Sequence, residues 1–224
     1  MELTALPEPD LALMPPLLRI GDKVRFVSPA STPEREWVFE GAKTFESWGL
    51  KVDFGEHVFR KVAYLAGTDE ERLADFNAAL RDPSVRAIIA TSGGKGSYRI
   101  ADRLDFAAAR SDPKFFVGFS DLTVLHLSLW KHCRLIGVHG SLVPDGQNGE
   151  SLRRALMTSK DICLHSRSDE QTAALTTLGT VKGRLIGGNL ETISAAAGWS
   201  LPSLEGAILL LEAVNMFPGK STGN

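Results

Sequence analysis

The sequence predicts an α/β protein built on a doubly wound, mostly parallel sheet, with a second, smaller domain behind it. Short β-prone apolar runs alternate with helical stretches over residues 17–144. One of these runs, Val85–Thr91, is apolar almost throughout, which is typical of a parallel strand covered on both faces. Polar or glycine-rich segments follow several of the strands, at the end of the sheet where such folds place their sites.

The elements follow in order after residues 1–16, which read as a loose leader interrupted by prolines. The predicted strands of the first domain cover residues 23–28, 50–54, 85–91, 115–117 and 135–138. A helix that begins after Pro33 carries Trp37, Val38 and Phe45 on one face and ends at Gly49. The next helix, 69–82, has an acidic first turn, which suits the helix dipole.

The regular alternation of strand-like and helical stretches ends near residue 145, so we expect domains at 17–144 and 145–224. The second domain begins with a helix at 150–157 and a possible strand at 161–166. A helix at 190–197 and a buried strand at 207–211 follow, and this strand leads directly into Glu212. A buried, unpaired carboxylate is costly, so Glu212 is a candidate functional residue. The alternative is that the strand ends there and Glu212 faces water.

Composition narrows the class of protein. A net charge of -2 gives no electrostatic reason to expect nucleic acid as a partner. No apolar run approaches the roughly 20 residues that cross a bilayer, and the N-terminus lacks the basic start of a signal peptide. Cys133 and Cys163 are too few and too isolated for a disulfide framework or a CxxC metal site. We therefore expect a cytoplasmic protein with no membrane partner.

The stretch 114–133 predicts a strand, a sharp turn at Ser120 and a helix. Such a turn lifts the serine hydroxyl clear of the sheet, toward the peptide N–H groups that open the helix. The sequence G-x-S-D lacks the second glycine of the usual nucleophile elbow. The alternative is that Ser120 caps the helix, with Asp121 in its first turn.

A glycine-rich loop, Ser92–Arg99, follows the third strand and is predicted to open a helix that runs through Ile100, Leu104 and Phe106. Its backbone N–H groups suit an anion or an oxyanion. The loop matches neither the P-loop nor G-x-G-x-x-G, and a purely structural turn explains its glycines equally well.

Several segments together resemble the LD-carboxypeptidases and the related microcin-immunity peptidases. They occur in the family's order across nearly the whole chain, and GFSD-x-T with a later IGGNL and LLLE is quite specific. The matching segments are GDKVRFVSPAS (21–31), SGGKGSYRIADRLDF (92–106), KFFVGFSDLTVLHLSLWK (114–131), GVHGSLV (137–143), GRLIGGNLETI (183–193) and AILLLEAV (207–214).

The resemblance implies a serine peptidase with a Rossmann-like first domain, a smaller β-rich second domain and usually a homodimer. Ser120 would be the nucleophile and Glu212 the acid that orients the catalytic histidine. The N–H groups of Asp121 and of Gly94, or of Gly93, would form the oxyanion hole, and Asn189 would bind substrate. The implied reaction removes the terminal D-alanine of murein tetrapeptide and needs no metal or cofactor.

The sequence departs from the family after Glu212, where Ala213 replaces an acidic residue. The resemblance places the catalytic histidine several dozen residues further on, and the sequence ends at Asn224. We therefore expect an incomplete second domain and impaired activity, unless His139 replaces the base. Two alternatives remain: a catalytically silent module that binds muropeptides, and a microcin-immunity-type peptidase that cleaves a peptidyl or aminoacyl nucleotide.

Overall fold

The computed structural model describes residues 11–142, 146–163 and 173–213, and five of its strands form one parallel sheet. The strand order is β2-β1-β3-β4-β5, so the winding reverses direction between β1 and β3. Their bounds are Lys23–Val27 for β1, Lys51–Phe54 for β2, Val85–Ala90 for β3, Phe115–Gly118 for β4 and Val138–His139 for β5. The predicted doubly wound, parallel sheet is confirmed, and its carboxyl ends flank a switch point of the kind that holds sites.

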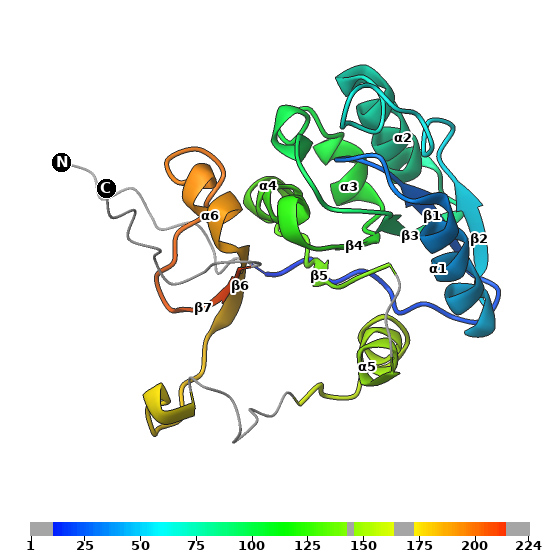
Figure 1. Ribbon diagram of the computed structural model, residues 1–224. Helices are drawn as coiled ribbons and strands as arrows, with labels where there is room; N and C mark the ends of the chain where they lie inside the picture. The colour runs from blue at the N-terminus through cyan, green and yellow to red at the C-terminus, as the bar shows by residue number, and fades with distance from the viewer. Residues whose placement is uncertain (1–10, 143–145, 164–172, 214–224) are drawn as a thin grey trace, which may run out of the picture.

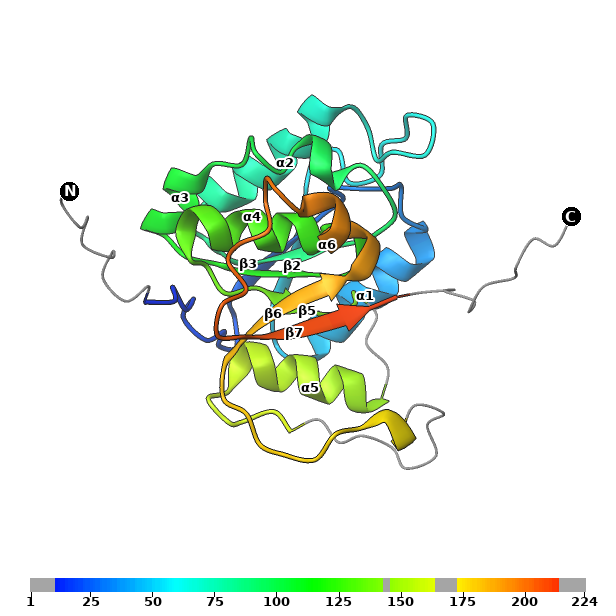
Figure 2. The same cartoon turned by 90° about the vertical axis from the view of Figure 1, so that its left-hand side faces the viewer.

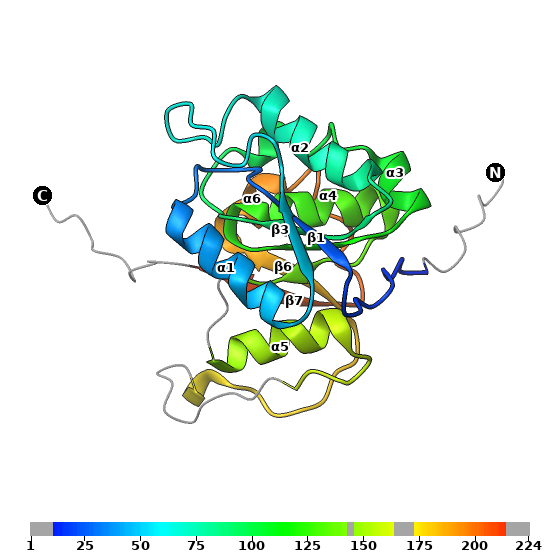
Figure 3. The same ribbon diagram turned by 90° about the vertical axis from the view of Figure 1, so that its right-hand side faces the viewer.

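Helices cover both faces of this sheet (Figures 1 and 3). One face packs against α2, α3 and α4 in an apolar core that includes Phe76, Ile88 and Phe116. The other face packs against α1 and α5, with Phe45 and Leu156 in that core. The helix bounds are Arg35–Ser47 for α1, Asp69–Arg81 for α2, Phe106–Ser111 for α3, Thr123–Cys133 for α4 and Gly146–Met157 for α5. These two cores hold the carboxyl ends of the strands in fixed positions.

A separate two-stranded parallel sheet lies beside α4, where Figure 2 shows it in front of the main sheet. It consists of β6 (Arg184–Asn189) and β7 (Ala207–Glu212), which α6 (Leu190–Ala196) and a loop connect. Leu127 of α4 packs against Ile186 and Ile193 in a third apolar cluster. The small additional sheet agrees with the expected fold class, and α4 joins it to the main sheet.

Several sequence-based expectations are wrong in detail. The helix predicted from the glycine-rich loop through Phe106 is a 3₁₀ turn, Ser97–Arg99, and α3 starts only at Phe106, because the Asp105 side chain caps that helix through the Ala108 N–H. Trp37 does not share the buried face of α1, since 66% of it is exposed.

The strand β7 is not buried, and Leu211, for example, is 51% exposed. Residues 161–163 form no strand, and 164–166 of that predicted strand lie outside the described residues. The domain boundary near 144 stays a prediction, although α5 packs on the first sheet. Of the leader, residues 1–10 lie outside the described part, while the Leu13 N–H donates to the Arg134 carbonyl at 2.8 Å. Among the described helices, none is long and apolar enough to cross a bilayer.

Candidate active site

The turn after β4 holds Ser120 in a strained conformation. Phe119 is extended, and Ser120 has a φ of 57°, in the left-handed region that residues other than glycine rarely adopt. The chain then forms a 3₁₀ turn, Ser120–Leu122, that continues as α4. No side-chain hydrogen bond caps either helical segment, so the alternative in which Ser120 caps the helix is wrong. The predicted order of strand, sharp turn and helix is confirmed.

The glycine-rich loop lies directly against this turn. A Cβ atom at Gly93 would lie 2.9 Å from Ser120 Cβ and 3.3 Å from Ser120 Oγ. Gly94 has a φ of 109°, and a Cβ there would lie 2.1 Å from Ser31 Oγ, which accepts a hydrogen bond from the Lys95 N–H at 3.1 Å. Glycine is therefore required at both positions, because the backbone approaches its neighbours too closely for a side chain.

Asp121 ties the turn to the 3₁₀ segment behind the loop. Its Oδ2 accepts a hydrogen bond from the Ser97 N–H at 2.8 Å, and Ser97 Oγ donates to the Asp121 carbonyl at 2.7 Å. Burial raises the pKa of the Asp121 carboxyl, and the hydrogen bonds from Ser97 oppose that shift. The Asp121 carboxylate thus binds the glycine-rich loop at Ser97, while the backbone of Asp121 lies at the start of the 3₁₀ turn Ser120–Leu122.

Thr123 connects the turn to the second sheet. Its Oγ1 donates to the Ser120 carbonyl at 2.7 Å and accepts from the Asn189 N–H at 3.0 Å. The Asn189 side chain caps α6 by accepting a hydrogen bond from the Thr192 N–H at 3.1 Å. Asn189, at the end of β6, is therefore fixed relative to Ser120 by a short chain of hydrogen bonds.

Glu212 ends β7, in register with Asn189. Its Oε2 is buried and has no hydrogen-bond partner in the described part of the chain. Burial lowers the pKa of His139, at the end of β5, and the negative charge of Glu212 opposes that shift. His139 and Glu212 are thus close enough to interact electrostatically.

His126 packs on the sheet, as expected. Its Nε2 lies 3.0 Å from the Gly118 carbonyl oxygen, and burial lowers the pKa of this imidazole to about 4. No histidine in the described ranges hydrogen-bonds to the Ser120 hydroxyl.

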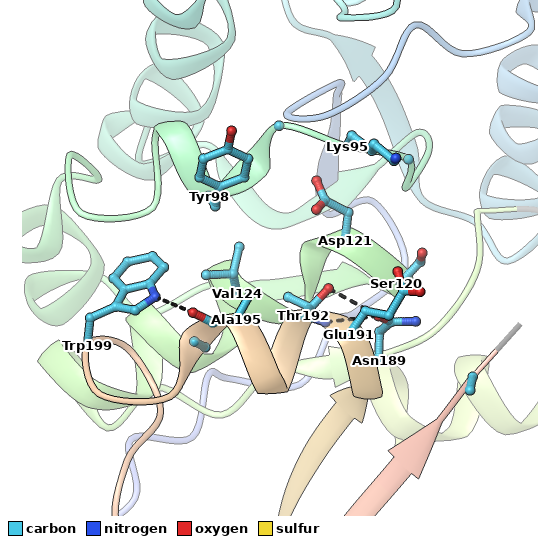
Figure 4. Close-up of a pocket in the computed structure, with 14 residues that line it drawn as sticks. Lys95, Tyr98, Ser120, Asp121, Val124, Asn189, Glu191, Thr192, Ala195 and Trp199 are labelled. Atoms are coloured by element: carbon cyan, nitrogen blue, oxygen red, sulfur yellow. Dashed lines mark hydrogen bonds between the residues drawn. The ribbon is translucent and has the colours of Figure 1, made fainter. Parts of the chain in front are cut away.

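A cleft of about 420 Å³ brings Ser120, Asp121, Gly94 and Asn189 together (Figure 4). Gly93 packs against Ser120. Ala213, the residue that follows Glu212, also lines the cleft. The cleft walls also include residues that the sequence did not single out: Lys95, Tyr98, Glu191, Thr192 and Trp199. Their sequence context gives little signal, although Lys95 and Tyr98 belong to the glycine-rich loop and Thr123 to the GFSD-x-T motif.

Comparison with known proteins gives the same family over both sheets. Residues 24–140 match the LD-carboxypeptidase N-terminal domain, and residues 182–222 match the C-terminal domain. A probable murein peptide carboxypeptidase of Bacillus subtilis is 31% identical over 91% of this chain and 66% of its own length. The murein tetrapeptide carboxypeptidase of Pseudomonas aeruginosa is 30% identical over 95% of this chain and 71% of its own length.

Among solved structures, the MccF-like protein of Bacillus anthracis matches with a TM-score of 0.82 and 25% identity, over 92% of this chain and 71% of that one. The chain thus spans about two thirds of the length of its relatives. Because the N-terminal family match alone extends over more than half of the sequence, this chain belongs to the LD-carboxypeptidase family.

Proposed function

We propose that this chain is a serine peptidase of LD-carboxypeptidase type, which removes the terminal D-alanine from murein tetrapeptide. The observation that carries the proposal is the left-handed Ser120, held at a strand-to-helix turn in the cleft with Gly93 packed against it. Strained residues of this kind cluster at active sites. The relatives named as murein peptide carboxypeptidases support the choice of substrate.

In this mechanism Ser120 Oγ attacks the carbonyl carbon of the scissile amide and forms a tetrahedral intermediate. The N–H groups of Asp121 and Gly94 stabilise the oxyanion, with the Gly93 N–H as the alternative donor. Neither the Asp121 nor the Gly94 N–H has a hydrogen-bond acceptor among the described residues, which supports this assignment. Asn189, fixed to Ser120 through Thr123, lies beside Ser120 in the cleft and contacts the substrate there (Figure 4).

A histidine must take the Ser120 proton and donate it to the amine nitrogen of D-alanine as the C–N bond breaks. A water molecule, activated by the same histidine, then hydrolyses the acyl ester on Ser120. We assign to Glu212 the role of accepting a hydrogen bond from this imidazole, because Glu212 Oε2 is buried without a partner among the described residues. The family resemblance places the base beyond Glu212. Within the described chain, the best candidate is His139, whose charge interacts with Glu212.

The test is release of D-alanine from purified murein tetrapeptide by the full chain, by Ser120→Ala and by His139→Gln, after circular dichroism shows all three to be folded. Release that is lost in Ser120→Ala supports the proposal, and loss in His139→Gln as well would identify His139 as the base. If the folded chain binds tetrapeptide without releasing D-alanine, the chain is the silent muropeptide-binding module instead.

A second candidate function is cleavage of a peptidyl or aminoacyl nucleotide, as in microcin-immunity-type peptidases. Two aromatic side chains, Tyr98 and Trp199, line the end of the cleft away from Ser120 and offer flat faces on which a base can stack (Figure 4). The match to the MccF-like structure favours the same reading. Ser120-dependent hydrolysis of an aminoacyl nucleotide that exceeds hydrolysis of tetrapeptide would select this function.

A further inference from the structure

We infer that Lys95 binds the terminal carboxylate of the substrate and so makes this site select peptides with a free C-terminus. The inference rests on the proposed function. An enzyme that removes only the last residue must distinguish a free carboxylate from a further peptide bond, and a cationic side chain near the nucleophile is the simplest means.

The charges in the cleft identify Lys95. Of the described residues that line it, Lys95 is the only basic one, while Asp121 and Glu191 are acidic. The positive charge of Lys95 acts on Asp121, the residue after Ser120, which places the ammonium group in the electrostatic neighbourhood of the elbow. Figure 4 shows Lys95 and Ser120 at the same end of the cleft, opposite Tyr98 and Trp199.

Lys95 is available for a ligand, whereas its cationic neighbours are not. Its ammonium group makes no hydrogen bond or salt bridge with any described residue. Arg99 forms a salt bridge with Asp69 at 2.7 Å, and the buried Arg72 binds the same carboxylate and the carbonyls of Pro29 and Gly96. A substrate carboxylate that enters the cleft therefore meets one unpaired cation.

The loop presents Lys95 from a fixed backbone. Gly94 and Gly96 on either side of it have φ values of 109° and 101°, and the Lys95 N–H donates to Ser31 Oγ. The carbonyl of Gly96 accepts from Arg72 at 2.9 Å. The backbone that carries Lys95 is therefore ordered before a ligand binds, which lowers the entropic cost of this contact.

The experiment measures binding of two peptides to the uncleaving Ser120→Ala chain, by quenching of Trp fluorescence with calorimetry as a second readout. The peptides are murein tetrapeptide and the same peptide with a C-terminal amide. Each is titrated against Ser120→Ala alone and combined with Lys95→Met, Lys95→Arg or Lys43→Met. Lys43 is an exposed lysine of α1 outside the cleft and serves as the matched control.

We expect Lys95→Met to weaken binding of the acid about tenfold, to leave the amide within about twofold, and to be rescued by Lys95→Arg. Lys43→Met should change neither. Equal weakening of acid and amide, no weakening at all, or failure of both peptides to bind would overturn the inference. Since binding is measured without turnover, a chain that releases no D-alanine but discriminates acid from amide through Lys95 would refute the proposed function and leave this inference standing.

Discussion

Replacing Thr123 with Val should loosen the elbow by removing one hydroxyl group. Thr123 is fully buried, and its Oγ1 serves both the Ser120 carbonyl, at 2.7 Å, and the Asn189 N–H, at 3.0 Å. Valine keeps the shape of threonine but neither donates nor accepts, so the carbonyl and the N–H both lose their partner. Each unsatisfied group costs about 1 kcal/mol or more.

The expected loss is therefore about 2–3 kcal/mol in the free energy of unfolding. Thr123→Ser is the matched control. It keeps the hydroxyl and removes only a methyl group that faces Gly188, which costs about 1 kcal/mol. For a chain of this length, the Val variant should lower Tm by about 4–12 °C.

Urea unfolding followed by far-UV circular dichroism measures both variants against the parent chain. D-alanine release should also fall in Thr123→Val and persist in Thr123→Ser, because the carbonyl and the hydroxyl belong to the same residue, Ser120. If Thr123→Val is as stable as the parent chain, or if Thr123→Ser loses as much stability as Thr123→Val, then the Thr123 hydroxyl does not stabilise the elbow.

Three further predictions concern other parts of the chain. Gly93→Ala should reduce D-alanine release at least tenfold, because its Cβ would lie 2.9 Å from Ser120 Cβ. Gly21→Ala is the control: its Cβ would have no atom within 4 Å, so this change should lower stability but not activity. Equal losses of activity in the two variants would contradict the prediction. Burial lowers the pKa of His126 to about 4, so below about pH 6.5 this histidine binds a proton in the unfolded chain before it does in the folded chain. The free energy of unfolding should therefore drop by about 2 kcal/mol between pH 7 and pH 5 in urea titrations. The drop should be smaller in His126→Gln. The exposed apolar side chains of β7 should drive self-association, so size-exclusion chromatography with light scattering should show a dimer or larger species that Leu211→Lys reduces, and a clean monomer of the parent chain would count against it.

Much of the main sheet follows from the sequence because its signals are local. The apolar runs of β1 and β3 are bounded by charged or glycine-rich residues, and their predicted ends lie within one residue of the observed ones. By contrast, β6 contains Gly187 and Gly188, which disfavour a strand in isolation. Both are required by contacts distant in sequence, since a Cβ would lie 1.9 Å from the Leu210 carbonyl oxygen in one case and 2.4 Å from Thr123 Oγ1 in the other.

The candidate site likewise contains residues that the sequence predicts and residues that only the three-dimensional packing reveals. Ser120 and the Gly93–Gly94 loop can be found from the sequence because each follows a strand, and parallel strands end at the same edge of the sheet. The bridging hydroxyl of Thr123 and the acceptor Ser31 depend on the packing of the second sheet and of the loop, which no local pattern encodes. The sequence predicts that β7 is buried because its residues are apolar. Apolar residues show that burial would be favourable, but they do not show whether another element covers the strand, and β7 is largely exposed.

The conformation of Ser120 separates a nucleophile elbow from an ordinary helix start. A capping serine is extended and accepts a hydrogen bond from the first helical turn, whereas Ser120 is left-handed and caps nothing. That conformation costs about 1–2 kcal/mol, so it persists only where the surroundings impose it. Here Thr123 binds the Ser120 carbonyl, the second sheet binds Thr123, and Gly93 packs closely against the Ser120 side chain. Because three separate parts of the chain converge on one unfavourable residue, we infer that the strain is retained for the position of the hydroxyl in the cleft.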